Sequence, residues 1–243
     1  MGTSSLAECD VVILCGGRGT RLGALTTTTP KPLLPVGGKT PFLVRRMLAL
    51  RQEGVTRIIL STHVFSEQFD ALQREYRDGL PQIHIVREPE PLGTGGGLRF
   101  ALSAVQTPYC LAMNGDSWVE QPLTPVLEAH HQHGRAFTMT VVDAAQVEGN
   151  SRQKGLVRVG AQREVLGFST GDATSGWVNA GLYAITTSRL AQWPTTAYDL
   201  ERQFLRLVPP SQSYAFPCAG RLIDIGTPDV YARGAELLTT LPA

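Results

Sequence analysis

The sequence has few cysteines and no long apolar run, and each absence excludes a class of protein. Its 243 residues include only 4 cysteines, none of them in a C-x-x-C pair. We therefore expect buried free thiols rather than a disulfide framework or a zinc site. No apolar run approaches the roughly 18–20 residues of a membrane-spanning helix. Residues 1–8 lack a basic segment followed by an apolar one, so we expect no signal peptide and a cytoplasmic protein.

An excess of charge is also absent. Lysine and arginine number 22 against 21 aspartates and glutamates, which gives a formal net charge of +1. Without a broad basic field, neither nucleic acid nor an anionic membrane is expected as a partner. Any phosphate site must then be a local arrangement of a few cations and backbone amides. No Ser/His/Asp or Cys/His set stands out either, and we expect His130, His131 and His133 to be solvated residues on a helix.

Apolar runs and helical patterns alternate through the first half of the chain. We expect strands over residues 10–15, 57–61, 83–86, 109–113 and 137–142, and helices over 42–52, 67–76, 98–105 and 125–133. This alternation predicts an α/β fold with a Rossmann-like, mostly parallel central sheet and helices on both faces. The less regular second half has strand patterns over 156–159, 165–168 and 178–185 and helical ones over 199–207 and 228–238. We expect it to add a small β region over the open end of the sheet.

Glycine is the residue type in excess, and its position is informative. The chain has 25 glycines, about 10% of its residues against an ordinary ~7%. They gather in loops at 16–19, 93–97 and 114–116 that follow or lie near predicted strands. Because ligands of parallel sheets bind at the carboxyl ends of strands, we expect these loops to converge on one crevice.

The first glycine loop suits a polyphosphate. It fails as a dinucleotide fingerprint because Leu22 holds the third glycine position, and a Walker-type reading of residues 38–40 fails because Leu33 holds the earlier one. Glycines let backbone amides approach phosphate oxygens closely. Arg21 can clamp a phosphate with two parallel N–H groups, and Lys31 lies between two prolines that restrict its backbone. The alternative is a tight strand-to-helix turn that binds nothing.

The segment LCGGRGTRLGALTTTTPKPLLPV at residues 14–36 resembles the signature of the sugar-1-phosphate nucleotidylyltransferases. Further matching segments are EPEPLGTGGG at 88–97, NGD at 114–116, NAG at 179–181 and DIGTP at 224–228. Within the family, the sequence is most similar to the D-glycero-α-D-manno-heptose 1-phosphate guanylyltransferases. The resemblance implies the nucleotide-diphospho-sugar transferase fold in a single domain over residues 9–238. Residues 9–120 would form the nucleotide-binding half and 121–238 the sugar-binding half, with 1–8 as a flexible tail.

The resemblance implies a reaction of a sugar 1-phosphate with a nucleoside triphosphate that gives a nucleotide sugar and pyrophosphate. A phosphate oxygen attacks the α-phosphorus in line, so positioning and charge neutralisation carry the catalysis. The implied catalytic residues are Arg21, Lys31, Asp116 and Asp224. Arg21 would bind the β- and γ-phosphates and Lys31 would act near the α-phosphate, while Asp116 and Asp224 would hold Mg²⁺. Arg18 would assist the phosphates or lie at the surface.

Substrate contacts are carried over from the same motifs. The implied nucleotide-binding residues are Leu14, Gly16, Gly17, Gly19, Thr20, Arg21, Glu88, Gly93 and Thr94, and the implied sugar-binding residues are Asn114, Gly155, Asn179 and Gly181. The Glu88 carboxylate only accepts hydrogen bonds, which suits the paired donors of guanine and favours GTP over UTP.

One departure from the family pattern concerns the acceptor phosphate. Many members carry a Glu-Lys pair where this chain has Ser169 and Thr170, and the lysine of that pair contacts the phosphate of the sugar. Either another cation, such as Arg152 or Lys154, takes this role here, or the contact is missing. Several readings therefore stay open beside the heptose guanylyltransferase. They are a GTP-dependent mannose-1-phosphate guanylyltransferase, a UTP-dependent uridylyltransferase of N-acetylmuramate 1-phosphate, and a non-catalytic nucleotide-sensing relative. Assembly into a homo-oligomer is also left open.

Overall fold

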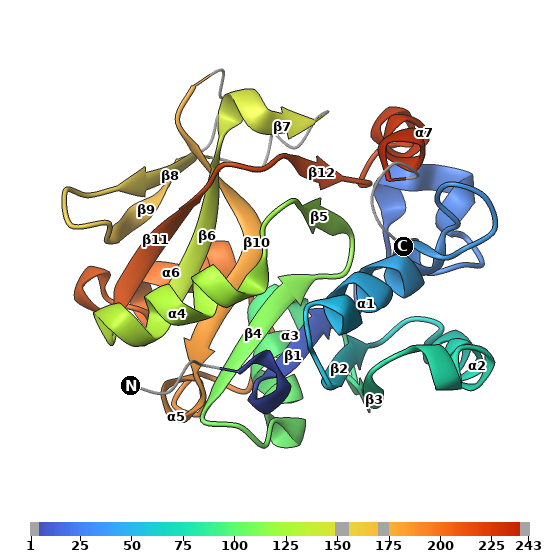
Figure 1. Cartoon of the computed structure of the whole chain (residues 1–243), viewed down its shortest axis with the longest axis horizontal. Coiled ribbons are helices and arrows are strands. Elements are labelled where there is room, and N and C mark those ends of the chain that lie inside the picture. Colours follow the sequence, from blue (N-terminus) through green and yellow to red (C-terminus); the bar gives the residue numbers. More distant parts are fainter. Residues whose placement is uncertain (1–4, 149–155, 170–174, 239–243) are drawn as a thin grey trace.

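A central sheet crosses the protein and carries helices on both faces (Figure 1). The computed structural model describes residues 5–148, 156–169 and 175–238. Along the sheet the strand order is β11 (Ser213–Cys218), β6 (Phe137–Asp143), β10 (Trp177–Thr186), β4 (Tyr109–Asn114), β1 (Asp10–Leu14), β2 (Arg57–Thr62) and β3 (Gln82–Arg87). The pairs β1–β2, β1–β4, β2–β3 and β6–β11 are parallel, and β10 runs antiparallel to β4 and β6. The predicted mostly parallel α/β sheet is confirmed.

Alternating side chains of β1 explain why the sheet is covered on both faces. Val11 and Ile13 belong to one apolar core with Leu43, whereas Val12 belongs to a second core with Leu98. The first core lies under α1 (Phe42–Gln52), α2 (Ser66–Glu75) and α4 (Leu123–His133). The second lies under α3 (Gly93–Ala101), α5 (Thr187–Leu190) and α6 (Leu200–Leu207). A strand buried on both faces has an unbroken apolar run, as residues 11–15 have.

The second half adds a hairpin and a small sheet. Strands β8 (Leu156–Val159) and β9 (Val165–Ser169) pair with each other, and β8 extends the central sheet at β10. The small sheet consists, in the described residues, of β5 (Ser117–Val119), β12 (Leu222–Asp224) and β7 (Val147–Glu148). Pairing of β12 with β5 places Asp224 opposite Ser117, directly beside the end of β4. Helix α7 (Pro228–Leu237) follows β12 and is the last helix of the described residues.

One predicted helix had wrong bounds because packing overrides the local pattern. The helix expected over 98–105 begins at Gly93 and ends at Ala101, so the glycine cluster is helical rather than a loop. A Cβ at Gly96 would lie 2.7 Å from the Thr196 carbonyl oxygen, so a glycine lets α3 lie against the segment before α6. In the expected tail, Leu6–Glu8 form a 3-10 helix in which Leu6 is buried; residues 1–4 lie outside the described part.

The prediction that the three histidines are solvated was wrong for His130. Its ring is only 1% exposed and lies between α4 and the sheet. Nδ1 lies 2.8 Å from Thr138 Oγ1 and Nε2 lies 3.1 Å from Thr186 Oγ1. Burial lowers the pKa of His130 to about 3, so the ring is neutral near pH 7. Helical spacing alone does not show which side of α4 the sheet covers.

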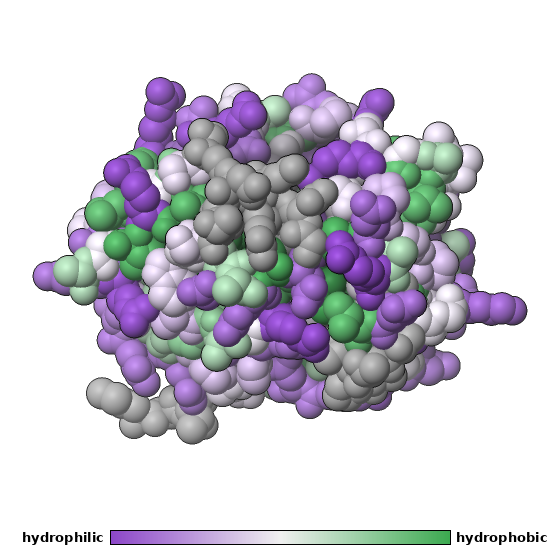
Figure 2. Space-filling model, turned by 90° about the horizontal axis from the view of Figure 1, so that it is seen from above, coloured by the Kyte–Doolittle hydropathy of each residue, from purple (hydrophilic) through white to green (hydrophobic). Residues whose placement is uncertain are grey.

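The cysteines and the hydropathy of the surface are those expected from the sequence. Cys9, Cys15, Cys110 and Cys218 are all free and buried, as expected. Within the described ranges, no helix is both long and apolar enough to cross a membrane. The face in Figure 2 is largely hydrophilic, and its apolar groups form patches separated by polar side chains.

Candidate active site

A cavity of about 460 Å³ opens at the carboxyl ends of β1 and β4. Several predicted site residues line it: Leu14, Gly16, Gly17, Arg21, Glu88, Gly93, Thr94, Asn114 and Asp116. An adjoining cavity of about 240 Å³ shares Leu14, Gly17, Arg21 and Asp116 with the first and adds Gly19, Thr20 and Lys31. The three glycine-bearing segments thus converge on one crevice, as the topology predicted, although residues 93–97 belong to helix α3.

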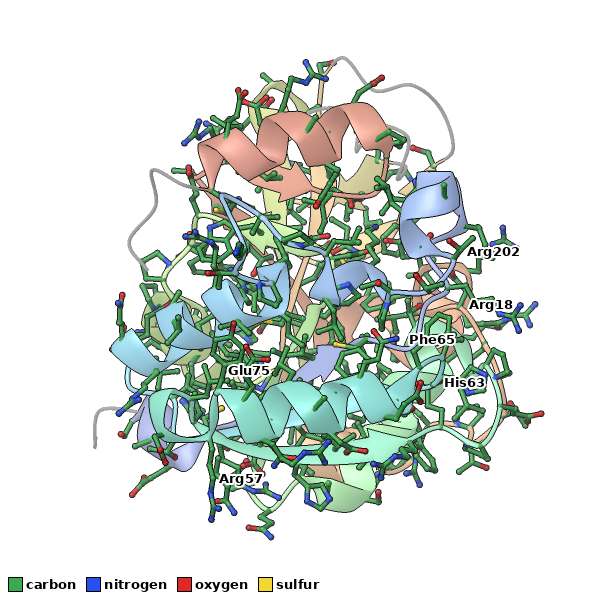
Figure 3. The ribbon with its side chains drawn as sticks, turned by 90° about the vertical axis from the view of Figure 1, so that its right-hand side faces the viewer. Arg18, Arg57, His63, Phe65, Glu75 and Arg202 are labelled. Atoms are coloured by element: carbon green, nitrogen blue, oxygen red, sulfur yellow. The ribbon has the colours of Figure 1, made fainter. Side chains whose placement is uncertain are left out.

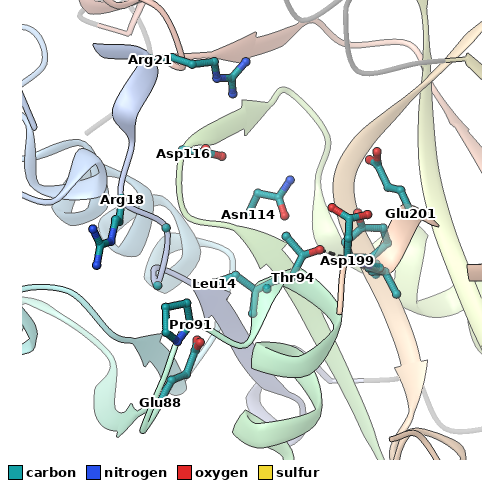
Figure 4. A pocket seen from close by; sticks show the side chains of 15 residues that line it. Leu14, Arg18, Arg21, Glu88, Pro91, Thr94, Asn114, Asp116, Asp199 and Glu201 are labelled. Carbon is teal, nitrogen blue, oxygen red and sulfur yellow. Dashed lines mark hydrogen bonds between the residues drawn. The ribbon is translucent and has the colours of Figure 1, made fainter. Parts of the chain in front are cut away.

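The larger cavity has three distinct sides (Figure 4). Arg21 and Asp116 lie at one end, and Glu88 with Pro91 lies at the opposite end. Glu201 lies on a third side, across Asn114. A charged end, a carboxylate with apolar neighbours, and an acidic wall can each hold a different part of a substrate.

Lys31 is the centre of the charged end. Its Nζ lies 2.6 Å from Asp116 Oδ2 and 3.5 Å from Asp224 Oδ1, and its side chain is 5% exposed. Arg21 joins Lys31, Asp116 and Asp224 beside Gly226. A Cβ at Gly226 would lie 2.9 Å from Asp224 Oδ1 and 3.1 Å from both Lys31 Nζ and Arg21 Nη2. The four predicted catalytic residues therefore meet around Gly226, where an added side chain would press on the ends of Asp224, Lys31 and Arg21.

The two aspartates fit the donor set of Mg²⁺. The Lys31 ammonium contacts both Asp116 Oδ2 and Asp224 Oδ1, so the two carboxylates lie close to each other. Over the part of the chain that the structure describes, no group of three or more His, Cys, Asp or Glu residues could hold a metal. Mg²⁺ is commonly held by one or two carboxylates together with substrate phosphates and water. Asp116 and Asp224 would hold the ion in that manner, and it would neutralise phosphate charge.

The glycine loop folds back on itself to present its cations. Gly19 has φ +64, which favours glycine, and a Cβ there would lie 3.1 Å from Lys31 Cβ and from Thr26 Cγ2. The Gly19 carbonyl accepts hydrogen bonds from Leu22 N at 2.9 Å and Thr26 Oγ1 at 3.0 Å. Arg18 lines the mouth of the cavity, but its side chain is exposed and points outward (Figure 3).

Glu88 is a buried carboxylate that joins three elements. It is 8% exposed, its Oε1 accepts from Ser61 Oγ at 2.9 Å and its Oε2 accepts from Leu92 N at 3.2 Å. A Cβ at Gly16 would lie 2.7 Å and a Cβ at Gly97 2.8 Å from Oε1. Two glycines therefore make room for this carboxylate at the cavity wall, and its contacts fix its orientation.

The predicted sugar-binding residues occupy two different layers. Asn114 lines the cavity, whereas Asn179 is 1% exposed and does not. Asn179 Nδ2 donates to Tyr183 Oη and to Glu201 Oε1, both at 2.8 Å, and its Oδ1 accepts from Gly181 N at 3.0 Å. Gly181, at φ +69, has no Cβ to strike the Asn114 amide. Gly155 lies outside the described residues, as do Arg152, Lys154 and Thr170.

Sequence reasoning missed the acidic wall. Tyr183, Asp199 and Glu201 line the cavity, and Asp199 also caps α6 by accepting from Arg202 N at 2.9 Å. A helix predicted to begin at residue 199 could have suggested the cap, but nothing in the pattern pointed to Glu201. Thr94 ties this wall to α3, because its Oγ1 accepts from Leu200 N at 2.9 Å.

A glycine loop with two arginines beside paired carboxylates, at the carboxyl edge of a parallel sheet, is typical of α/β proteins that bind nucleotides. The sequence model described as "Nucleotidyl transferase" matches residues 10–238, and the chain belongs to this family.

Curated relatives and solved structures agree with this membership. The mannose-1-phosphate guanylyltransferase of Mycobacterium tuberculosis is 31% identical over 237 residues, which cover 94% of this chain and 64% of that protein. The mannose-1-phosphate guanylyltransferase catalytic subunit beta of Danio rerio is 33% identical, covering 92% of this chain and 62% of that protein. The chain thus spans less than two thirds of the length of these relatives.

Among solved structures, HddC from Yersinia pseudotuberculosis superposes with a TM-score of 0.82 at 27% identity, over 94% of this chain and 99% of that one. A structure of the same protein complexed with GMP-PN gives a TM-score of 0.83. A putative glucose-1-phosphate thymidylyltransferase from Bacillus anthracis, at 17% identity, covers 97% of both chains with a TM-score of 0.81 and shows the shared fold alone.

Proposed function

We propose that the protein transfers a guanylyl group from GTP to the 1-phosphate of an otherwise uncharged sugar and releases pyrophosphate. The observation that carries the proposal is the meeting of Arg21, Lys31, Asp116 and Asp224 beside a cavity of about 460 Å³. Two cations and two carboxylates suit the charge that builds up during phosphoryl transfer. The names of the Mycobacterium and Danio relatives and the GMP-PN complex of HddC support guanine as the base.

Each residue at the charged end has a separate task in this proposal. Arg21 binds the β- and γ-phosphates and stabilises the departing pyrophosphate. Lys31 neutralises charge at the α-phosphate, and its two carboxylate contacts hold its ammonium in place before the reaction begins. Mg²⁺ bound at Asp116 and Asp224 would supply further neutralisation of phosphate oxygens. The acceptor phosphate is already ionised near neutral pH, so its attack needs no general base.

The base is proposed to lie at the end of the cavity that contains Glu88. Each Glu88 oxygen accepts one hydrogen bond from the protein and keeps a further lone pair for a ligand. Guanine offers N1–H and an amino group side by side, whereas uracil offers one donor. The orientation of this carboxylate therefore favours GTP over UTP.

The acidic wall favours a neutral sugar. Glu201, Asp199 and Tyr183 offer acceptors and a hydroxyl to sugar hydroxyl groups. N-acetylmuramate carries its own carboxylate, which two acidic side chains would repel. We propose D-glycero-α-D-manno-heptose 1-phosphate as the acceptor, from the sequence resemblance. Mannose 1-phosphate is the second candidate, because the curated relatives are named for it.

Pyrophosphate release tests the proposal. Purified protein is assayed with Mg²⁺ over GTP, UTP, ATP and dTTP, each with the heptose, mannose and N-acetylmuramate 1-phosphates. We expect release with GTP and a neutral sugar phosphate, and loss of release when EDTA removes the metal. A preference for UTP with N-acetylmuramate 1-phosphate would refute the assignment. No release with any pair would instead support a nucleotide-sensing protein without catalysis.

A further inference from the structure

A second ligand-sized cavity, of about 520 Å³, shares no residue with either cavity at the charged site. It lies where β10 ends, between α5 and the carboxyl end of α6. Figure 1 shows α5 beside the end of β10 and α6 behind the sheet. Its volume falls in the range of roughly 300–1,000 Å³ that is usual for small-molecule sites. The cavity is therefore large enough for a ligand and separate from the proposed active site.

The lining of this second cavity is apolar at its base and cationic at its edge. Phe137, Ile185 and Trp193 are buried and form part of the apolar base. Arg189 and Arg206 are exposed, and neither forms an ion pair with another described residue. Of the described residues that line the cavity, none is Asp or Glu. The active-site cavity differs in this respect, since it contains acidic side chains.

We propose that this second cavity binds a small organic anion that has an apolar body. The apolar part packs against the buried base, and a phosphate, sulfonate or carboxylate group contacts Arg189 and Arg206. Guanidinium groups bind such anions through paired N–H donors. A neutral polar molecule would leave the apolar base unused, and a cation would meet two like charges.

Three elements connect the second cavity with the acidic wall of the active site. The Phe137 ring lies 5.3 Å from the Tyr183 ring and 5.9 Å from the Trp193 ring, centroid to centroid. Tyr183 and Ile185 are two residues apart on β10, and each lines a different cavity. Helix α6 has Glu201 at the active site and Arg206 at the second cavity. An anion that moves α6 or Phe137 therefore changes the wall proposed to hold the sugar.

Fluorescence titration with 8-anilinonaphthalene-1-sulfonate tests the site, because this probe has an apolar ring system and one sulfonate. We expect binding of one probe per chain to the folded protein, weakened at least about tenfold in the double variant R189E/R206E. The double variant R189K/R206K keeps both charges and should retain most of the binding. N-phenyl-1-naphthylamine, a neutral probe with the same ring system, should bind all three proteins alike.

Two further variants locate the probe. Arg202 is an exposed arginine on α6 that does not line the second cavity, so R202E should leave binding unchanged. R21A removes a cation from the active site and should also leave it unchanged. Loss of binding in R202E or R21A, or normal binding in R189E/R206E, would overturn the proposal. Far-UV circular dichroism and melting temperature confirm that each variant is folded.

The effect on catalysis rests on the proposed function and is measured separately. With the probe bound, we expect the KM for the sugar 1-phosphate to change several-fold while the KM for GTP stays nearly constant. The change should vanish in R189E/R206E. An unchanged sugar KM would refute the connection to the acidic wall, whereas absence of any turnover would refute the proposed function and leave the binding titration as the test of the site.

Discussion

The ammonium of Lys31 lies 2.6 Å from one carboxylate, Asp116 Oδ2. The same ammonium lies 3.5 Å from Asp224 Oδ1, so one cation serves both carboxylates that are proposed to hold the metal. Three segments far apart in the sequence supply these groups. The two contacts of Lys31 therefore hold these segments together and also position the groups proposed for catalysis.

Replacing Lys31 should affect stability and turnover in different ways. Lys31→Met leaves the 4% exposed Asp224 side chain without its lysine contact and removes the cation between two carboxylates. We expect the free energy of unfolding without Mg²⁺ to fall by about 3 kcal/mol, since removing one partner of a buried ion pair is destabilising. Mg²⁺ should restore much of this stability but not the turnover, which we expect to fall at least about 100-fold.

Thermal unfolding with and without Mg²⁺ checks this expectation, alongside pyrophosphate release. Lys39→Met is the matched control, because Lys39 is exposed and lines neither site cavity. A Lys31→Met protein as stable as the control without Mg²⁺ would show that the two contacts contribute nothing to stability.

Arg18 and Arg21 are both exposed arginines of the glycine loop, but only Arg21 is proposed to bind the β- and γ-phosphates. Arg21 Nη2 lies near the position that a Cβ of Gly226 would occupy, together with Lys31 and Asp224, whereas Arg18 points outward. We expect Arg21→Ala to lower kcat/KM for GTP by roughly 10²–10³, as loss of one preorganised charge contact does. Arg18→Ala should change it less than about tenfold. Equal losses in the two variants would contradict the assigned roles.

The sequence could identify the members of the charged site but not their contacts. Arg21, Lys31, Asp116 and Asp224 each lie in a motif that resembles the family. Their meeting depends on the pairing of β12 with β5, a long-range contact that local periodicity does not contain. The same limit explains Glu201, which reaches the cavity because α6 packs against α3.

The wrong predictions have related physical causes. The glycines of residues 93–97 suggested a loop because glycine is a poor helix former. Close packing of α3 against neighbouring backbone outweighs that preference. The predicted sugar contact of Asn179 stays a prediction, and in the structure this residue lies behind the cavity wall, where its amide donates to Tyr183 and Glu201. A motif marks such a residue without showing which layer it occupies.

Two histidines of α4, the buried His130 and the half-buried His133, should make the protein sensitive to acid. Burial is the largest cause that lowers the pKa of His130 to about 3 and of His133 to about 4, from an ordinary 6.5. The unfolded chain therefore binds more protons than the native protein below pH 6.5, and stability falls as the pH decreases from about 6.5 toward 4. Above pH 6.5 these rings contribute no pH dependence.

Chemical denaturation between pH 4 and 8 measures this effect. We expect His130→Gln to lose part of the decrease in stability below pH 6.5, whatever its stability at pH 8. His84→Gln is the control, since His84 is exposed on β3. If the His130 variant and the wild-type protein show the same slope, the buried ring is not the cause of the acid sensitivity.

Glu201 provides the most direct test of the acidic wall. Its Oε1 accepts from Asn179 Nδ2 at 2.8 Å, and Glu201 lines the cavity beside Tyr183. Glu201→Gln keeps the size of the side chain and an oxygen that can accept from Asn179, but removes the charge.

We expect this variant to raise the KM for the 1-phosphate of an uncharged sugar about tenfold, because hydrogen bonds to a charged acceptor are stronger. The KM for GTP should stay within about twofold, since Glu88, where the guanine is proposed to bind, lies on another side of the cavity. A sugar phosphate that carries a carboxylate, such as glucuronate 1-phosphate, should become a better substrate as the repulsion falls. Asp70→Asn changes a half-buried acidic residue that lines neither site cavity, so it is the matched control and should change neither constant. Steady-state kinetics with the three substrates decides the matter: a rise in the KM for GTP alone would place Glu201 at the nucleotide and remove it from the sugar wall.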